Sequence, residues 1–175
     1  MRNIWTNLFL FVFVLLAVLL LEGDFATIPK APSETPLRQG VTYGVDHVID
    51  GDTVVVRKGG REETIRLIGI DTPESEHAPG GPECFHAEAT AKARELLEGE
   101  EIVVMTDPTQ DERDAYDRLL AYITLPDGTD FGAQMIEGGF AKEYTFKGRD
   151  YERQSTYRQL VVTADAKNVG LWKCE

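Results

Sequence analysis

Residues 66–74 read Arg-Leu-Ile-Gly-Ile-Asp-Thr-Pro-Glu, a stretch that begins as a strand and ends in charged side chains. An apolar run with one glycine inside it is typical of a buried strand near a bend or bulge. Pro73 cannot continue a β-ladder and holds the residue before it extended, so we expect the strand to end near Asp71. Alone, the stretch fits a solvated turn as well as a site in which Arg66, Asp71 and Glu74 act together.

Two further stretches favour a site. Residues 48–56, Val-Ile-Asp-Gly-Asp-Thr-Val-Val-Val, are two β-rich runs joined by an Asp-Gly turn, which is a routine hairpin signal. Asp52 and Thr53 follow this turn, at a point where the turn no longer requires them. Residues 114–122, Asp-Ala-Tyr-Asp-Arg-Leu-Leu-Ala-Tyr, lead from polar residues into an apolar strand, with Arg118 at the boundary.

In this order and spacing, the three stretches resemble the staphylococcal nuclease-like (thermonuclease) family. The matching signatures are an Asp-Gly-Asp-Thr turn, an arginine separated by four residues from Asp-Thr-Pro-Glu, and Tyr-x-Arg before an apolar strand. Each signature alone is weak, and the three together are specific. The similarity extends over about residues 42–172, nearly the whole region after the N-terminal segment.

Hydrophobic patterning predicts an α+β domain with five strands and about three helices. The predicted strands cover 41–49, 53–57, 63–70, 101–105 and 119–125, and the predicted helices cover 85–97, 131–137 and 150–167. The hydrophobic pattern by itself predicts only the α+β fold class. The family resemblance implies a five-stranded OB-fold β-barrel with packed helices, a fold often used for oligonucleotides.

The composition is that of a globular chain with an acidic surface. The 175 residues are 42% hydrophobic and 27% charged, and the net charge is −12. An acidic chain is a poor candidate for non-specific, phosphate-driven binding to nucleic acid, which normally requires a basic face. A bound divalent cation or a few locally placed arginines would reconcile the net charge with a nuclease.

The N-terminus predicts an export or anchoring segment. Residues 1–21 hold a long apolar run, with Arg2 ahead of it and acidic residues behind it. Such a segment is a cleaved signal peptide or an uncleaved transmembrane signal-anchor helix, and either one places the following domain outside the cytoplasm. No persuasive cleavage site is present, which favours a membrane anchor. Residues 22–40, with three prolines, are expected to be a flexible linker ahead of a domain at 41–175.

Cys84 and Cys174 are the two cysteines of the chain, and neither has a second cysteine or a histidine at zinc-binding spacing. If the domain lies outside the cytoplasm, the two are expected to form a disulfide between the loop before the main helix and the C-terminus. The alternative is two unrelated thiols.

The resemblance implies a Ca²⁺ site and a general base. It assigns the side chains of Asp52 and Asp71 and the carbonyl of Thr72 to the metal, and oxygen ligands of this kind suit Ca²⁺. Glu74 matches the family's general base. It lies three residues past a metal-binding aspartate on a turn fixed by proline, where it can face the same water.

Arg66 and Arg118 match the family's two phosphate-binding arginines, whose planar guanidinium groups can each hold two phosphate oxygens. The alternative for each is a surface salt bridge: Arg66 with a nearby glutamate, and Arg118 with Asp114 or Asp117.

Tyr116 matches a family position that contacts the nucleotide, and Tyr144 matches an aromatic residue that stacks on a base. Ordinary packing is the alternative for both tyrosines.

The chain departs from the family pattern in ways that weaken substrate affinity more than chemistry. Asp117 stands where a glycine often precedes the second arginine, and Ala115 stands where a lysine often binds phosphate. The 75–83 loop carries no lysine or arginine. In a regular strand, Arg66 and Asp71 would also point to opposite faces, so a shared pocket requires a bend, for which Gly69 is the candidate.

The resulting prediction is a monomeric, extracytoplasmic, Ca²⁺-dependent endonuclease that cuts DNA and/or RNA with little sequence preference and leaves 3′-phosphate ends. One alternative is a non-catalytic OB-fold module that binds nucleic acid. Another is a Ca²⁺-stabilised structural domain on a membrane stalk.

Overall fold

The computed structural model describes residues 40–75 and 80–174. All of them belong to the second of the two units into which the chain divides, Leu37–Glu175. The predicted N-terminal helix over 1–21, and all but the last residue of the predicted linker, lie outside the described residues. Within the described part of the chain, no helix combines the length and the apolarity that a membrane crossing requires.

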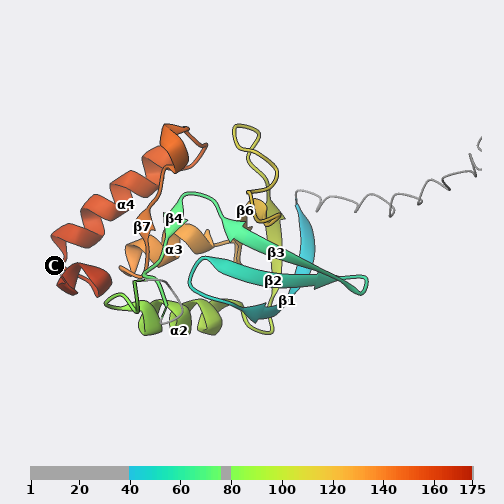
Figure 1. The fold of residues 1–175 in the computed structure, drawn as a ribbon, viewed down its shortest axis with the longest axis horizontal. Helices are drawn as coiled ribbons and strands as arrows, with labels where there is room; N and C mark the ends of the chain where they lie inside the picture. The colour runs from blue at the N-terminus through green and yellow to red at the C-terminus, as the bar shows by residue number, and fades with distance from the viewer. Residues whose placement is uncertain (1–39, 76–79, 175) are drawn as a thin grey trace, which may run out of the picture. The chain divides into compact units, whose positions relative to one another are not determined.

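Five strands close into a barrel in the order β1-β2-β3-β6-β5 (Figure 1). Neighbouring strands pair antiparallel, except for β3 and β6, which pair parallel. This arrangement confirms the predicted five-stranded barrel of an α+β domain. The barrel strands are β1 (Val41–Val48), β2 (Thr53–Lys58), β3 (Arg61–Leu67), β5 (Glu101–Met105) and β6 (Leu119–Thr124).

Alternate residues of these strands form the core of the barrel. Val54 and Val56 of β2 and Ile65 and Leu67 of β3 are buried, as expected when successive side chains of a strand point to opposite faces. Each such side chain contributes about 1.5–3 kcal/mol of hydrophobic stabilisation. The other barrel strands add Ile102, Val104, Leu119, Ala121 and Ile123 to the same cluster.

The three helices are α2 (His86–Leu97), α3 (Phe131–Glu137) and α4 (Gln154–Ala166). Helix α2 packs on β1 and α3 packs on β6, whereas α4 packs on α3 and β7 (Figure 1). The buried residues of α2 are Ala89, Ala93 and Leu97, whose spacing of four places them on one stripe of the helix. Helix α3 begins after Asp130, whose side chain caps it by accepting a hydrogen bond from the amide of Ala133.

The prediction that the last long helix begins at residue 150 was wrong. The helix starts at Gln154, because residues 150–153 are held by other partners. The amide of Glu152 donates to Asp107, and the hydroxyl of Tyr151 donates to Glu143 at 2.8 Å. Helical period in the sequence could not reveal these long-range bonds.

The predicted strand over 63–70 is interrupted by a bend at Gly69. Strand β3 ends at Leu67, and a separate short strand, β4 (Ile70–Asp71), pairs with β7 (Lys142–Glu143), which the sequence did not indicate. Gly69 has φ +80°, and a Cβ at this position would lie 2.5 Å from the ring of Tyr151. The bend is therefore possible only for a residue without a side chain.

A buried carboxylate holds together the segments that follow β5 and precede α4. Asp107 is 4% exposed. One of its oxygens accepts from the amide and hydroxyl of Thr109, and the other accepts from the hydroxyl of Tyr122 at 2.5 Å and the amide of Glu152 at 2.8 Å. Four donors satisfy this carboxylate, which is the condition for burying it without a large penalty.

A disulfide joins Cys84, just ahead of α2, to Cys174 at the end of the final 3₁₀ helix η2 (Gly170–Cys174). The two residues are 90 positions apart in the sequence. Closing so long a loop restricts the unfolded chain and stabilises the fold by a few kcal/mol.

Replacing Gly69 by alanine is expected to lower the free energy of unfolding by more than about 1 kcal/mol, because of the positive φ and the contact with Tyr151. Gly59→Ala is the matched control, since Gly59 has φ +58° but no atom within 4 Å of the position of a Cβ. Urea unfolding of both variants measures the difference. Equal losses in the two variants would contradict the role given to Tyr151.

Asp107→Asn is expected to lower the free energy of unfolding at neutral pH by about 1–3 kcal/mol, because an amide NH₂ replaces one of the two accepting oxygens. Burial raises the pKa of Asp107, but hydrogen bonds from Tyr122, Glu152 and Thr109 outweigh it and hold the pKa below its usual value.

The stabilisation from ionised Asp107 is therefore complete above about pH 4 and is lost as the pH falls through the lowered pKa. The difference in unfolding free energy between wild type and Asp107→Asn should narrow below about pH 4. A difference that stays constant across this range in urea titrations would show that the charge of Asp107 does not contribute.

Candidate active site

Asp52 lies at the centre of the site, directly after the turn between β1 and β2, and is 6% exposed. One of its carboxylate oxygens accepts from the amide and the hydroxyl of Thr72, at 2.9 and 3.0 Å. The other oxygen lies 3.1 Å from Nη1 of Arg66. Gly51 packs so closely that a Cβ there would lie 2.6 Å from a side-chain carbon of Thr72. The Asp-Gly-Asp-Thr turn and the Asp-Thr-Pro-Glu segment therefore dock directly on each other.

Arg66 bridges two aspartates. Its Nη2 lies 2.9 Å from a carboxylate oxygen of Asp71, and its Nη1 also donates to the carbonyl of Ile70 at 2.9 Å. The bend after β3 makes this possible, because it returns Asp71 to the side of the chain on which Arg66 lies. The salt bridge considered for Arg66 thus forms with Asp52 and Asp71, and not with a glutamate.

The carboxylates of the site repel one another. Burial, and then the charge of Asp52, raises the pKa of Asp50 to about 6. Burial and then Asp52 also raise the pKa of Asp71 above its ordinary value, against the opposing effect of Arg66. One guanidinium is too little positive charge for this cluster, so a further cation would relieve the repulsion.

The donor set fits a hard divalent cation that takes few ligands from the protein. Within residues 40–75 and 80–174, no group of three His, Cys, Asp or Glu side chains is placed to hold a metal ion. Asp52 and Asp71 supply two carboxylates, and the side chain of Asp71 is half exposed. Backbone carbonyls, water and substrate oxygens would have to complete the coordination, as Ca²⁺ and Mg²⁺ both allow.

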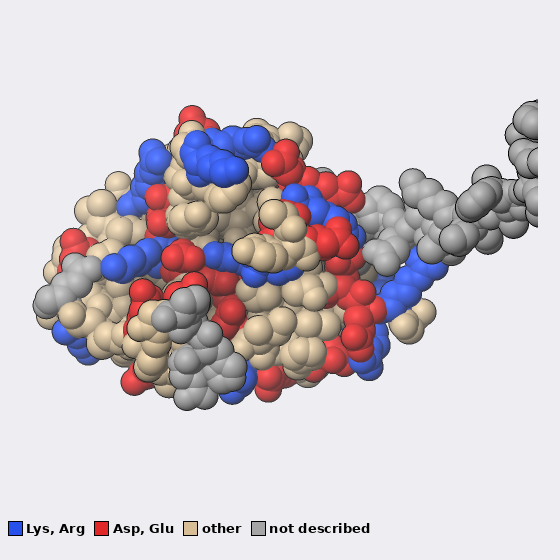
Figure 2. Space-filling model, in the orientation of Figure 1, with Lys and Arg blue, Asp and Glu red and all other residues tan. Residues whose placement is uncertain are grey.

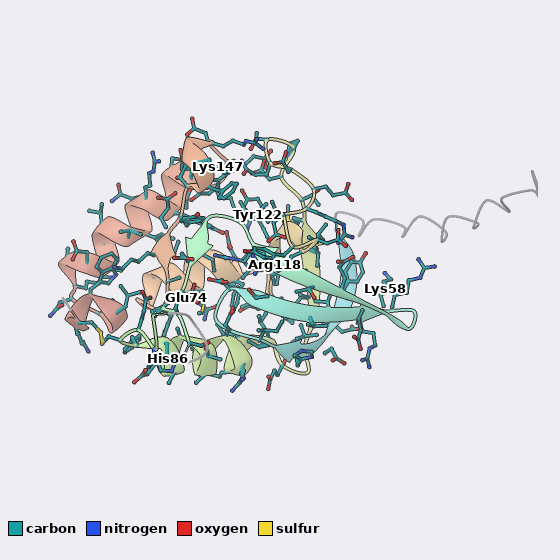
Figure 3. The ribbon with its side chains drawn as sticks, viewed as in Figure 1. Lys58, Glu74, His86, Arg118, Tyr122 and Lys147 are labelled. Carbon is teal, nitrogen blue, oxygen red and sulfur yellow. A yellow bond between two sulfur atoms is a disulfide. The ribbon has the colours of Figure 1, made fainter. Side chains whose placement is uncertain are left out.

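Glu74 follows the turn at Pro73 and is exposed. Its amide donates to a carboxylate oxygen of Glu83 at 3.0 Å, and its carbonyl accepts from the amide of Glu83 at 2.9 Å. Among the described residues, no ion pair engages the carboxylate of Glu74. Figure 3 places Glu74 near β4 and Arg118 beside β3, and both line the same pocket.

Arg118 is held by Asp114 at the start of β6. Its Nε lies 2.6 Å from one carboxylate oxygen, and its amide donates to the other at 3.0 Å. Asp117 has φ +66°, a conformation that favours glycine and that aspartate tolerates. This explains why a glycine suits the position. The carboxylate of Asp117 is 86% exposed and lies 3.7 Å from Arg113.

Arg66, Asp71, Glu74 and Arg118 line a pocket of about 600 Å³ that has two further walls. One wall comes from residues 110–118, and the other comes from residues 144–151. Tyr116, Tyr144 and Phe146 line it and are exposed, at 81%, 42% and 50%. Figure 2 shows basic and acidic side chains alternating across this face, with a second group of basic side chains at its upper rim.

Sequence reasoning missed part of this pocket. Phe146 and Lys147, in the short 3₁₀ helix η1 (Phe146–Gly148), lie in the wall beside Tyr144, and the ring of Phe146 is 6.4 Å from that of Tyr144. The alternation of aromatic residues before a Lys-Gly pair was the available signal. Arg113 was also missed. It pairs with both carboxylate oxygens of Glu63 at 2.8 Å, through a contact 50 residues apart in sequence.

The chain matches known proteins along most of its length. Residues 64–174 match the model of the family described as staphylococcal nuclease homologue. The chain is 29% identical to thermonuclease of Staphylococcus intermedius over 177 residues, covering 99% of each protein. It is 30% identical to thermonuclease of Staphylococcus hyicus over 166 residues, covering 94% of this chain and 92% of the relative.

A third relative matches a shorter region. Endonuclease YncB of Bacillus subtilis is 31% identical over 102 residues, which cover 58% of this chain and 47% of that protein. The family match spans more than half of the chain and includes Arg66, Asp71, Glu74 and Arg118. The chain belongs to the staphylococcal nuclease family.

Proposed function

We propose that the protein is a Ca²⁺-dependent endonuclease that hydrolyses phosphodiester bonds of DNA and/or RNA with little sequence preference and leaves 3′-phosphate ends. The observation that carries the proposal is the convergence of Arg66, Arg118, Asp71 and Glu74 on one pocket, next to the buried Asp52. Relatives named thermonuclease and endonuclease support the same activity.

Asp52, Asp71 and the carbonyl of Thr72 are the groups that would hold the calcium ion. The raised pKa of Asp71, caused by burial and by Asp52, supports this assignment, because a divalent cation would offset the repulsion between the two carboxylates. A bound calcium ion supplies positive charge that stabilises the additional negative charge on phosphate during attack.

Glu74 acts as the general base. Its exposed carboxylate, which no described residue engages in an ion pair, is free to accept a proton from the attacking water. The oxygen of that water bonds to phosphorus, and the bond from phosphorus to the 5′ oxygen breaks. The departing 5′ oxygen takes up a proton from solvent, and the phosphate stays on the 3′ side. Glu74 then releases to solvent the proton that it accepted, so the net reaction adds one water across the bond.

The two arginines stabilise the charge that develops on phosphate. Asp114 holds Nε of Arg118, so the two terminal nitrogens of the guanidinium remain for a phosphate, as no described residue bonds them. Arg66 is held between Asp52 and Asp71, which fixes its position beside them. Charge stabilisation by groups already in place is the largest contribution to many enzymatic rate enhancements.

The pocket walls suggest how substrate is held. Exposed aromatic rings such as Tyr116 and Tyr144 can stack on bases of any sequence, which suits a sequence-tolerant enzyme. The net charge of −12 keeps long-range attraction to nucleic acid low, so binding rests on these local contacts.

The protein acts outside the cytoplasm as a monomer, held on the membrane by its N-terminal segment or released after cleavage. The disulfide between Cys84 and Cys174 supports an oxidising location.

Glu74→Gln is expected to lower kcat on DNA by about 10²- to 10⁴-fold, because the amide cannot accept the proton of water. Glu98→Gln, an exposed glutamate at the far end of α2, is the matched control and should leave kcat unchanged. The rate of digestion of single-stranded and duplex DNA is measured for each protein, first with Ca²⁺ and then with EDTA. Comparing the proteins tests whether Glu74 is required, and comparing the two conditions tests whether the metal ion is required. A folded protein that binds DNA but never cuts it would instead be a non-catalytic binding module.

Arg118→Lys is expected to lower kcat by about 10²- to 10³-fold, because lysine keeps the charge but cannot present two parallel donors to phosphate. Arg94→Lys, on the exposed face of α2, is the control. Steady-state kinetics and thermal melting should show a loss of turnover at an unchanged melting temperature. Wild-type turnover in Arg118→Lys would remove this residue from the mechanism.

A further inference from the structure

Glu74 has few contacts that determine where its carboxylate lies. It is exposed and follows Pro73, and its own carboxylate has no ion-pair partner among the described residues. A general base contributes only when it is held within reach of its proton, and a displacement of about 1 Å can cost about 10²-fold in rate. Some other group must therefore position this residue.

Glu83 contacts the backbone of Glu74 at two points. The Glu83 carboxylate accepts from the Glu74 amide at 3.0 Å, and the Glu83 amide donates to the Glu74 carbonyl at 2.9 Å. The two residues are nine apart in sequence, and this reciprocal pair of bonds joins Glu83 to the backbone of Glu74. It also fixes both peptide groups that flank the Cα of Glu74.

This contact has an electrostatic cost. The Glu83 carboxylate lies against the Glu74 amide, so it adds negative charge beside a site that already holds Asp52 and Asp71. The cost is offset by a charge-assisted hydrogen bond to the Glu74 amide.

Glu83 is itself anchored to the rest of the domain. The next residue, Cys84, is bonded to Cys174, and the ring of Phe85 stacks on Phe140 at 5.6 Å. The segment that holds Cys174 is fixed in turn, because the amide of Leu171 donates to the carbonyl of Gly139 at 2.8 Å. A covalent and packed connection thus runs from the end of the chain to the residue that holds Glu74.

We infer that Glu83 is a positioning residue for Glu74, and that the Cys84–Cys174 disulfide anchors it for that purpose. Glu83 touches neither water nor phosphate in this role. Glu83 holds the backbone of Glu74 through the two hydrogen bonds. The disulfide at the next residue, Cys84, in turn holds Glu83 in place. The inference rests on the proposed function, in which Glu74 is the general base.

The test compares Glu83→Ala, Glu83→Gln and the double variant Cys84→Ser/Cys174→Ser in the full-length protein. Glu83→Ala is expected to lower kcat by about 10- to 100-fold with KM nearly unchanged, because the base is misplaced while the binding groups remain. Glu83→Gln keeps an accepting oxygen for the Glu74 amide and should recover most of the loss. The double variant should lose kcat in the same direction.

Two controls separate positioning from general stability. Glu88→Ala, an exposed glutamate in the first turn of α2, should leave kcat unchanged. Hydrogen exchange at the Glu74 amide, followed by NMR at a temperature where every variant is folded, reports the contact without requiring activity. Exchange should accelerate in Glu83→Ala and in the double variant, and stay slow in Glu83→Gln.

Unchanged amide exchange and unchanged kcat in Glu83→Ala, while Glu74→Gln is inactive, would overturn the inference and leave the proposed function intact. If wild type and Glu74→Gln cut DNA equally well, the proposed base fails instead. In that case, the amide exchange still decides whether Glu83 and the disulfide hold residue 74.

Discussion

The site depends on one sharp change of chain direction after β3. Gly69 adopts a positive φ, and the ring of Tyr151 occupies the space that a side chain at this position would need. The bend sends Ile70 and Asp71 into pairing with β7, and it returns the Asp71 carboxylate to within 2.9 Å of Arg66. Without it, an arginine and an aspartate five residues apart would face opposite sides of the strand.

A second constraint is the balance of charge. The chain carries a net charge of −12, and in its site the carboxylates of Asp52 and Asp71 both contact the partly buried Arg66. Asp52 accepts hydrogen bonds from Thr72 and pairs with Arg66, and Asp114 holds Arg118, so these charged groups are positioned by an opposite charge or a backbone donor. Strict positioning of this kind is what a pre-organised phosphate site requires.

Local patterns were enough to predict the barrel strands and the helices α2 and α3, because β-rich apolar runs, helical spacing and the glycines that end elements are all visible in the sequence. Strand β7 has two residues, too few for any period, and was missed. The start of α4 was placed too early because Asp107 and Glu143 draw residues 151 and 152 out of the helix. Arg113 belongs to no motif, and the aromatic alternation that includes Phe146 was overlooked, so the pocket walls were only partly predicted.

The sequence by itself determined the class of chemistry, since the Asp-Gly-Asp-Thr, Asp-Thr-Pro-Glu and Tyr-x-Arg motifs name the acids and arginines of the site. Only the tertiary structure decided that Arg66 lies between Asp52 and Asp71, that Glu83 bonds to the backbone of Glu74, and that the next residue, Cys84, is joined to Cys174. The reason is physical. These contacts join segments up to 90 residues apart, and they depend on backbone bends and packing that no local pattern encodes.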